Sequence, residues 1–197
     1  MRRDEGGRVC GMQKERRGYC ESMRVDVYKK YSREDALCQT NGYFSLNLRK
    51  SSVPEIVRLL ELREGDTVGW IGCGDARELL EVAQQFPLVR FRGIDHNETA
   101  IRIARRVLSQ IGLHNVRLDC LNALDDFATY SHVFSTAIYG DELNRHLHRI
   151  CTKRLCLLAS MWIVAPEDFE AATVRLSGSG EQRQLIAGRV THEAALD

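Results

Sequence analysis

The chain lacks the features that mark several large classes of protein. None of its apolar runs approaches the about 18 residues that cross a lipid bilayer, which excludes a membrane-spanning protein. Residues 1–7 are charged rather than apolar, so a secretory signal is not expected. The net charge of +1 provides no overall attraction to nucleic acids or acidic membranes.

Cysteine pairs of the Cys-x-x-Cys type are also absent. The seven cysteines are scattered along the chain, so their spacing predicts neither a zinc site nor a redox motif. An odd number of unpaired cysteines is typical of a reducing compartment, and we expect the protein in the cytoplasm or nucleus.

Charge is concentrated near the N-terminus. Residues 2–33 contain ten basic and five acidic side chains. One interpretation is contact with RNA or another acidic surface, and the other is a solvated arm without a partner. We expect a basic arm over residues 1–50 and one folded domain over residues 51–197.

The rest of the chain alternates between strand and helix patterns. Amphipathic helices are predicted from residue 52 to 62, from the glycine turn at 72–74 to Pro87, over 97–111 and over 141–150, with Asn97 and Gly112 as caps of the third. Strands are predicted over 67–71, 89–94, 116–121, 132–138 and 154–160, followed by a hairpin of 172–176 and 184–190. Apolar strands between amphipathic helices indicate an α/β fold with a parallel sheet covered on both faces.

The first strand ends in the most informative motif of the sequence. Gly72-Cys73-Gly74 breaks the strand and opens a helix, and Asp95 ends the next strand 21 residues after Gly74. Glycines let a ligand touch the backbone at a helix N-terminus, and the acid can accept hydrogen bonds from both hydroxyls of a ribose. A dinucleotide site normally has a third glycine where this chain has Arg77. S-adenosylmethionine is therefore the favoured cofactor, and a nicotinamide-dependent oxidoreductase is the weaker alternative.

With these motifs in this order, residues 53–190 resemble the class I, Rossmann-like methyltransferases that use S-adenosylmethionine. The resemblance implies a doubly wound, mostly parallel seven-stranded sheet with a C-terminal antiparallel hairpin. It also implies a cofactor that lies across the carboxyl ends of the first four strands. The positions expected to bind the cofactor are Gly72, Cys73, Gly74, Asp75, Asp95, His96, Asn122 and Ala123.

Two positions depart from the family pattern. Trp70 stands where the family usually has an acid, and Ala76 replaces a frequent third glycine. Asp75 is then the nearest carboxylate for the cofactor ammonium. Purely structural interpretations remain open: the glycines as a tight turn, Asp95 as a helix cap and Asn122 as a turn residue.

The acceptor side shows a fainter resemblance, to the non-SET histone-lysine methyltransferases of the disruptor-of-telomeric-silencing class. Tyr139-Gly140 fits the aromatic-glycine part of that pattern, while Ser135 and Thr136 stand where asparagines would be. The segment 41–44 before the first helix matches the lid of that class. We therefore predict an acceptor channel formed by Tyr43, Phe44, Thr136 and Tyr139.

An apolar, aromatic channel favours the neutral amine that a lysine needs as a nucleophile. Two alternatives remain open: a methyltransferase acting on a small molecule, and an inactive protein that only binds S-adenosylmethionine. Methyl transfer requires no metal. His146 and His148 lie two residues apart on a helix, so we expect surface positions and no metal pair.

Overall fold

The fold was examined in a computed structural model that describes residues 53–136, 141–160, 170–175 and 182–190. The predicted arm and lid over residues 1–50 lie outside the described residues. So do Tyr43, Phe44 and Tyr139 of the predicted channel.

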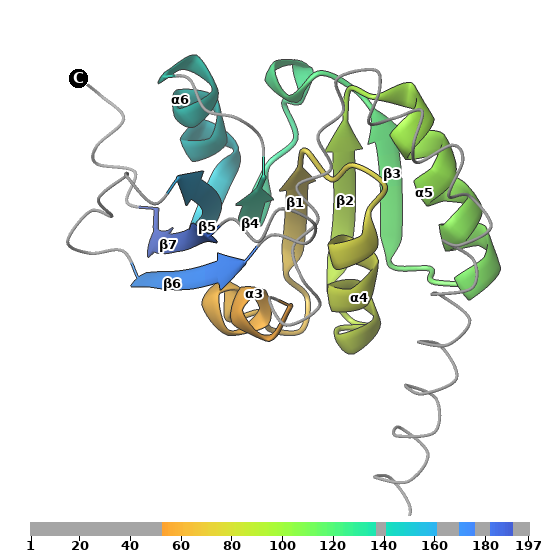
Figure 1. The fold of residues 1–197 in the computed structure, drawn as a ribbon, viewed down its shortest axis with the longest axis horizontal. Helices are drawn as coiled ribbons and strands as arrows, with labels where there is room; N and C mark the ends of the chain where they lie inside the picture. The colour runs from red at the N-terminus through yellow and green to blue at the C-terminus, as the bar shows by residue number, and fades with distance from the viewer. Residues whose placement is uncertain (1–52, 137–140, 161–169, 176–181, 191–197) are drawn as a thin grey trace, which may run out of the picture.

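A seven-stranded sheet forms the centre of the molecule, with the strand order β3-β2-β1-β4-β5-β7-β6 (Figure 1). Strands β1 to β5 are parallel, whereas β7 pairs antiparallel with both β5 and β6. The bounds are Thr67–Ile71 (β1), Arg90–Asp95 (β2), Val116–Cys120 (β3), Tyr130–Ser135 (β4), Cys151–Ser160 (β5), Glu170–Arg175 (β6) and Gln182–Arg189 (β7). The predicted parallel sheet with a C-terminal antiparallel hairpin is confirmed.

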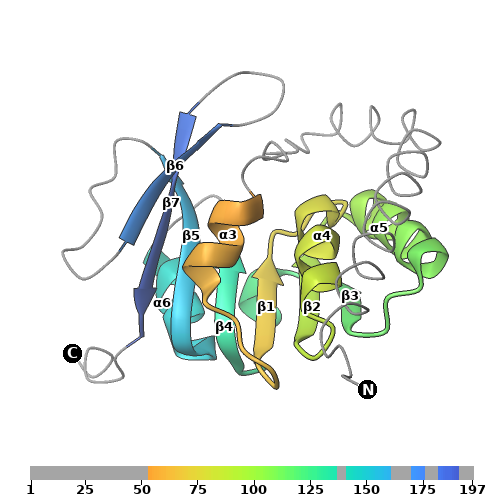
Figure 2. The same ribbon diagram turned by 90° about the horizontal axis from the view of Figure 1, so that it is seen from below.

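Helices cover both faces of the sheet (Figure 2). Apolar residues of α3, α4 and α5 pack in one large cluster on the first face, and α6 packs with residues of β4 and β5 on the other. The helices span Val53–Leu60 (α3), Arg77–Gln85 (α4), Glu98–Ile111 (α5) and Asp141–Ile150 (α6), and a short 3-10 helix spans Ala123–Asp125 (η2). This arrangement is doubly wound, as predicted.

Local signals set the ends of α5. The Asn97 side chain accepts a hydrogen bond from the Ala100 amide at 3.0 Å, which caps the first turn. Gly112 ends the helix at φ 67°, in the left-handed region that glycine adopts without strain, and its amide donates to Leu108. Both caps were predicted from the residue types alone.

Two strands begin earlier than their apolar runs indicate. Strand β4 begins at Tyr130 and β5 at Cys151, two and three residues before the predicted starts at 132 and 154. These two residues are partners in the parallel ladder, and both are buried. Pairing with β4 therefore extends β5 through Thr152 and Lys153. Because these side chains are polar, the apolar pattern did not predict this part of the strand.

A tyrosine and an arginine cover part of the α6 face, where only the short helix η2 lies between β3 and β4. The Tyr130 ring lies against Gly69, where an added Cβ would be only 2.7 Å from the ring. Its hydroxyl donates to Asp126 at 2.7 Å, and Arg92 donates to both Asp126 and Asp119. This side-chain layer replaces helical cover over β1 and β2.

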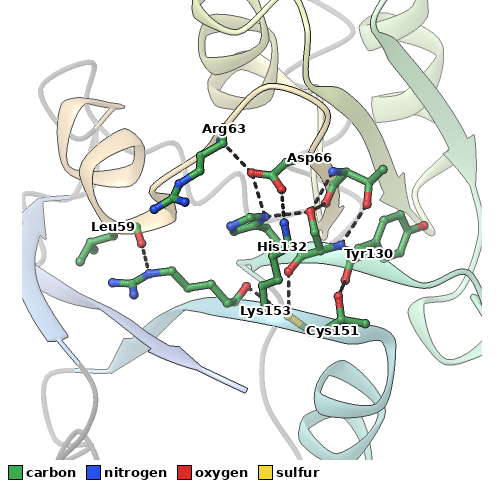
Figure 3. Close-up of polar contacts among 11 residues, drawn as sticks. Leu59, Arg63, Asp66, Tyr130, His132, Cys151 and Lys153 are labelled. Atoms are coloured by element: carbon green, nitrogen blue, oxygen red, sulfur yellow. Dashed lines mark hydrogen bonds and ion pairs between the residues drawn. The ribbon is translucent and has the colours of Figure 1, made fainter. Parts of the chain in front are cut away.

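At the amino ends of β1 and β4, a polar network surrounds Asp66 (Figure 3). Asp66 accepts hydrogen bonds from the Arg63 amide and from the Lys153 ammonium, both at 2.7 Å. Burial raises the pKa of Asp66, but these bonds outweigh it and leave the pKa below its ordinary value. The His132 ring reaches Ser131 at 2.9 Å and Asp66 at 3.8 Å.

His132 is expected to make stability depend on pH. Burial lowers its pKa, aided by Lys153 and Arg154 and opposed by Asp66 and Glu61, so the native ring stays neutral where an unfolded histidine takes up a proton. The free energy of unfolding should fall between about pH 7.5 and 5.5, with a slope of up to about 1.4 kcal/mol per pH unit.

Urea denaturation across this pH range measures that slope. His132→Gln should flatten the slope. A smaller slope of the same sign should remain, because partial desolvation also lowers the pKa of His148. An unchanged slope in the variant would remove His132 from the pH response.

One histidine prediction was wrong. His148 is exposed, but His146 has only 4% of its surface exposed, and the Phe127 ring lies edge-on to it. Arg149 lies 2.8 Å from its Nδ1 atom. Within the described ranges, every helix is too short or too polar to cross a bilayer, and no three metal-ligating side chains gather together.

Candidate cofactor site

Four neighbouring strand ends carry residues predicted to form the cofactor site and, at β4, the acceptor channel. In the order β3-β2-β1-β4, the carboxyl ends are followed by Asn122, His96, Gly72 and Thr136. The chain leaves β1 toward α4 on one face of the sheet and leaves β4 toward α6 on the other. A crevice for a ligand is expected at such a switch point in an open parallel sheet.

The glycine turn after β1 has left-handed backbone at both glycines. Gly72 has φ 73° and Gly74 has φ 55°, conformations that a residue with a side chain adopts only with strain. The Gly72 amide donates to the Ile94 carbonyl at 2.8 Å, which fastens the turn to the end of β2.

Asp95 ends β2 and joins the glycine turn to α5. Its Oδ2 atom accepts a hydrogen bond from the Gly74 amide, and its Oδ1 atom accepts one from the Asn97 amide, both at 2.8 Å. Only 6% of Asp95 is exposed. An ionised carboxylate offers about four acceptor positions, so this carboxylate is held rigidly and retains capacity for two ribose hydroxyls.

Thr136 connects the turn to the end of β4. Its amide donates to Ile71 at 3.1 Å, and its hydroxyl donates to the Gly72 carbonyl at 2.6 Å. The side chain therefore points to the backbone of the glycine turn. Sequence reasoning placed Thr136 in an acceptor channel and missed this contact, which joins residues 64 positions apart.

The segment after β3 supplies the remaining predicted positions. Asn122 is exposed, and its side-chain oxygen accepts from the Leu124 amide at 3.1 Å, so it caps η2 as the structural interpretation predicted. Ala123 packs against the α6-side core. The His96 side chain is 85% exposed, and its Nδ1 atom lies 3.7 Å from Asp95. Of these three residues, His96 is the one whose side chain lies near Asp95.

Part of this chain is similar to known proteins. A family model described as "Putative methyltransferase" matches residues 67–137, from the start of β1 to just past Thr136. An uncharacterised protein of Rickettsia prowazekii is 31% identical over 73 residues, which cover 36% of this chain and 29% of that protein. The matched part thus spans less than a third of this curated relative.

Solved structures share most of the fold. Magnesium protoporphyrin IX methyltransferase from Synechocystis, with bound SAM, has a TM-score of 0.59 at 16% identity, over 72% of this chain and 79% of that one. An RNA methyltransferase from Salinibacter ruber, in complex with S-adenosyl-L-homocysteine, has a TM-score of 0.59 at 19% identity, over 75% and 95%. The protein has the class I methyltransferase fold. The resemblance stated from the sequence is confirmed at this level.

Trp70 departs from the methyltransferase pattern because it belongs to the core. It is 1% exposed, and its ring lies 4.2 Å from that of Phe134, centroid to centroid. Cys73 also turns into the core on the α4 side, where burial raises the pKa of its thiol. Neither side chain is presented to the crevice.

Asp75 and Ala76 complete the turn of this methyltransferase fold. Asp75 is 2% exposed and accepts a hydrogen bond from Arg77 at 2.6 Å. Ala76 has φ 63°, a left-handed conformation that glycine adopts without strain. A non-glycine residue in this conformation costs roughly 1–2 kcal/mol, and the surrounding contacts must offset that strain.

Proposed function

We propose that the protein is a methyltransferase that uses S-adenosylmethionine. The single observation that supports this best is the pair of hydrogen bonds that fix Asp95 between the glycine turn and the first turn of α5. This contact presents a rigid carboxylate beside a turn whose two glycines have no side chain, which is the arrangement that a ribose needs.

The residues that would hold the cofactor divide into two groups. Asp95 would bind the ribose hydroxyls, with Asn122 and His96 beside it for the adenosine half. The backbone of Gly72 and Gly74 would pass close to the methionine half. When bound, S-adenosylmethionine supplies an activated methyl group, so the chain's own task is to align a nucleophile in line with that group and to exclude water.

For the acceptor we propose a protein lysine, as the fainter sequence resemblance implies. Thr136 borders the crevice on the β4 side, next to the segment that carries Tyr139. Because Tyr43, Phe44 and Tyr139 lie outside the described residues, this part of the proposal rests on the sequence.

One experiment separates the candidate functions. The purified protein is incubated with S-adenosylmethionine labelled in its methyl group, together with histone octamers or a fractionated cell extract. Label in protein that hydrolyses to methyl-lysine supports the lysine acceptor, and label in the low-mass fraction supports a small-molecule acceptor. The inactive binding protein, which Trp70 makes a real alternative, is supported if calorimetry detects cofactor binding and no fraction is labelled.

Asp75→Asn tests the methionine half of the site. We propose that Asp75, although paired with Arg77, offsets the charge of the cofactor ammonium, because the usual acid is replaced by Trp70. The variant should bind S-adenosylmethionine about tenfold more weakly, since a hydrogen bond to a charged group is lost. Added salt should have a smaller effect, because a buried pair is screened little.

Adenosine, which has no ammonium group, is the matched ligand in this calorimetric titration. Its affinity should not change in Asp75→Asn. Equal losses for both ligands, or no loss for either, would exclude the role proposed for Asp75.

A further inference from the structure

We infer that Thr136 is a positioning residue that sets the distance between the two sides of the crevice, and this inference rests on the proposed function. The last partners in the ladder between β1 and β4 are Ile71 and Ser135. Thr136 extends this ladder by one backbone bond, from its amide to the Ile71 carbonyl, and adds a side-chain bond to Gly72. It is thus the last link between these strands before their connections separate.

The peptide groups of Gly72 are held from both neighbouring strands. Its amide donates to Ile94 at the end of β2, and its carbonyl accepts from the Thr136 hydroxyl at the end of β4. The next glycine amide, of Gly74, donates to the carboxylate of Asp95. A shift of the Gly72 carbonyl would therefore be passed along the turn to the carboxylate proposed to hold the ribose.

The acceptor is expected to approach from the β4 side. Tyr139, one of the residues predicted to form the acceptor channel, follows Thr136 in the sequence, whereas the segment to which the Thr136 hydroxyl donates is the cofactor turn. Methyl transfer is sensitive to alignment, and a displacement of about 1 Å can cost roughly 100-fold in rate. A hydroxyl that ties the two segments together at the switch point therefore fixes the geometry of the reaction without touching either reactant.

The opposite end of the same strand pair provides a matched control. The Thr67 hydroxyl oxygen accepts a hydrogen bond from the Ser131 amide at 2.9 Å, so it also links β1 to β4. Thr67 lies at the start of β1, whereas the glycine turn follows the end of that strand. Replacing either threonine by valine removes one link between the strands and keeps the side-chain shape.

The test compares Thr136→Val, Thr136→Ser and Thr67→Val by calorimetry with S-adenosylmethionine and by hydrogen exchange of the amides. Thr136→Val should bind the cofactor about fivefold more weakly, as expected for one lost hydrogen bond, and the Gly74 amide should exchange faster. Thr136→Ser should restore both values. Thr67→Val should lower the midpoint of urea unfolding without changing affinity or exchange at Gly74.

The outcomes distinguish this inference from the proposed function. If the wild type does not bind S-adenosylmethionine while Gly74 exchange still responds to Thr136→Val, the proposed function fails. The inference that Thr136 holds the glycine turn in place then still stands. If the wild type binds but Thr136→Val behaves like Thr67→Val in affinity and exchange, the positioning role is overturned. Failure of the serine variant to restore affinity would overturn it as well.

Discussion

Gly74→Val should abolish detectable binding of S-adenosylmethionine. Gly74 has φ 55°, and its amide holds the Asp95 carboxylate. A branched side chain at this position would strain the turn and fill the space through which the ligand meets the backbone. We expect the affinity to fall by about 100-fold or more, because both the turn and its contact with Asp95 are disturbed. Calorimetric titration of the folded variant measures the loss.

Gly112→Val is the control for Gly74→Val. It shows how much of the effect comes from backbone strain and how much from a lost contact with the ligand. Gly112 has φ 67°, and an added Cβ there would meet nothing within 4 Å. In urea unfolding, this variant should lose a similar amount of stability to Gly74→Val. It should bind the cofactor as the wild type does. If both valine variants unfold, Gly74→Ala and Gly112→Ala provide the same comparison. Normal binding by a folded Gly74→Val would mean that the turn has only a structural role.

Asp95→Ala should weaken the binding of S-adenosylmethionine by more than about 100-fold, since two ribose hydroxyls lose a charged acceptor worth roughly 1.5–3 kcal/mol for each bond. Stability should fall too, because the amides of Gly74 and Asn97 lose their partner. Asp95→Asn keeps one acceptor oxygen and should give smaller losses. Calorimetry and urea unfolding on the same samples measure both effects.

Asp66→Ala is the control for the loss of a buried carboxylate that lies away from the cofactor site. Asp66 is 4% exposed and also holds a backbone amide, but it lies at the amino ends of the strands. This variant should lose stability and bind the cofactor normally under conditions where it is folded. Unchanged affinity in Asp95→Ala would remove Asp95 from the site.

Features set by neighbouring residues could be predicted from the sequence. The glycine turn, the cap at Asn97 and the stop at Gly112 each depend on the conformation or hydrogen bond of a single residue type, so the pattern identified them. Strand β1 and helix α6 have the predicted bounds because their apolar residues follow a clear period.

Features that depend on distant contacts could not be predicted. The starts of β4 and β5 are set by pairing between the two strands, and the polar residues of β5 gave no apolar signal. His146 is buried and lies edge-on to Phe127 of the β3–β4 connection, a contact that the pattern of α6 alone does not indicate. The hydroxyl of Thr136 has several acceptors within reach in principle, and only the folded sheet brings Gly72 to it.

The burial of Trp70 limits which side chains position 70 accepts. Its ring fills the core beside Phe134, so an acid at this position would leave a cavity and place a charge among apolar side chains. A carboxylate could be accommodated there only if the neighbouring core residues were changed with it. Engineering a stronger cofactor site in this chain would therefore start at the turn that follows rather than at position 70.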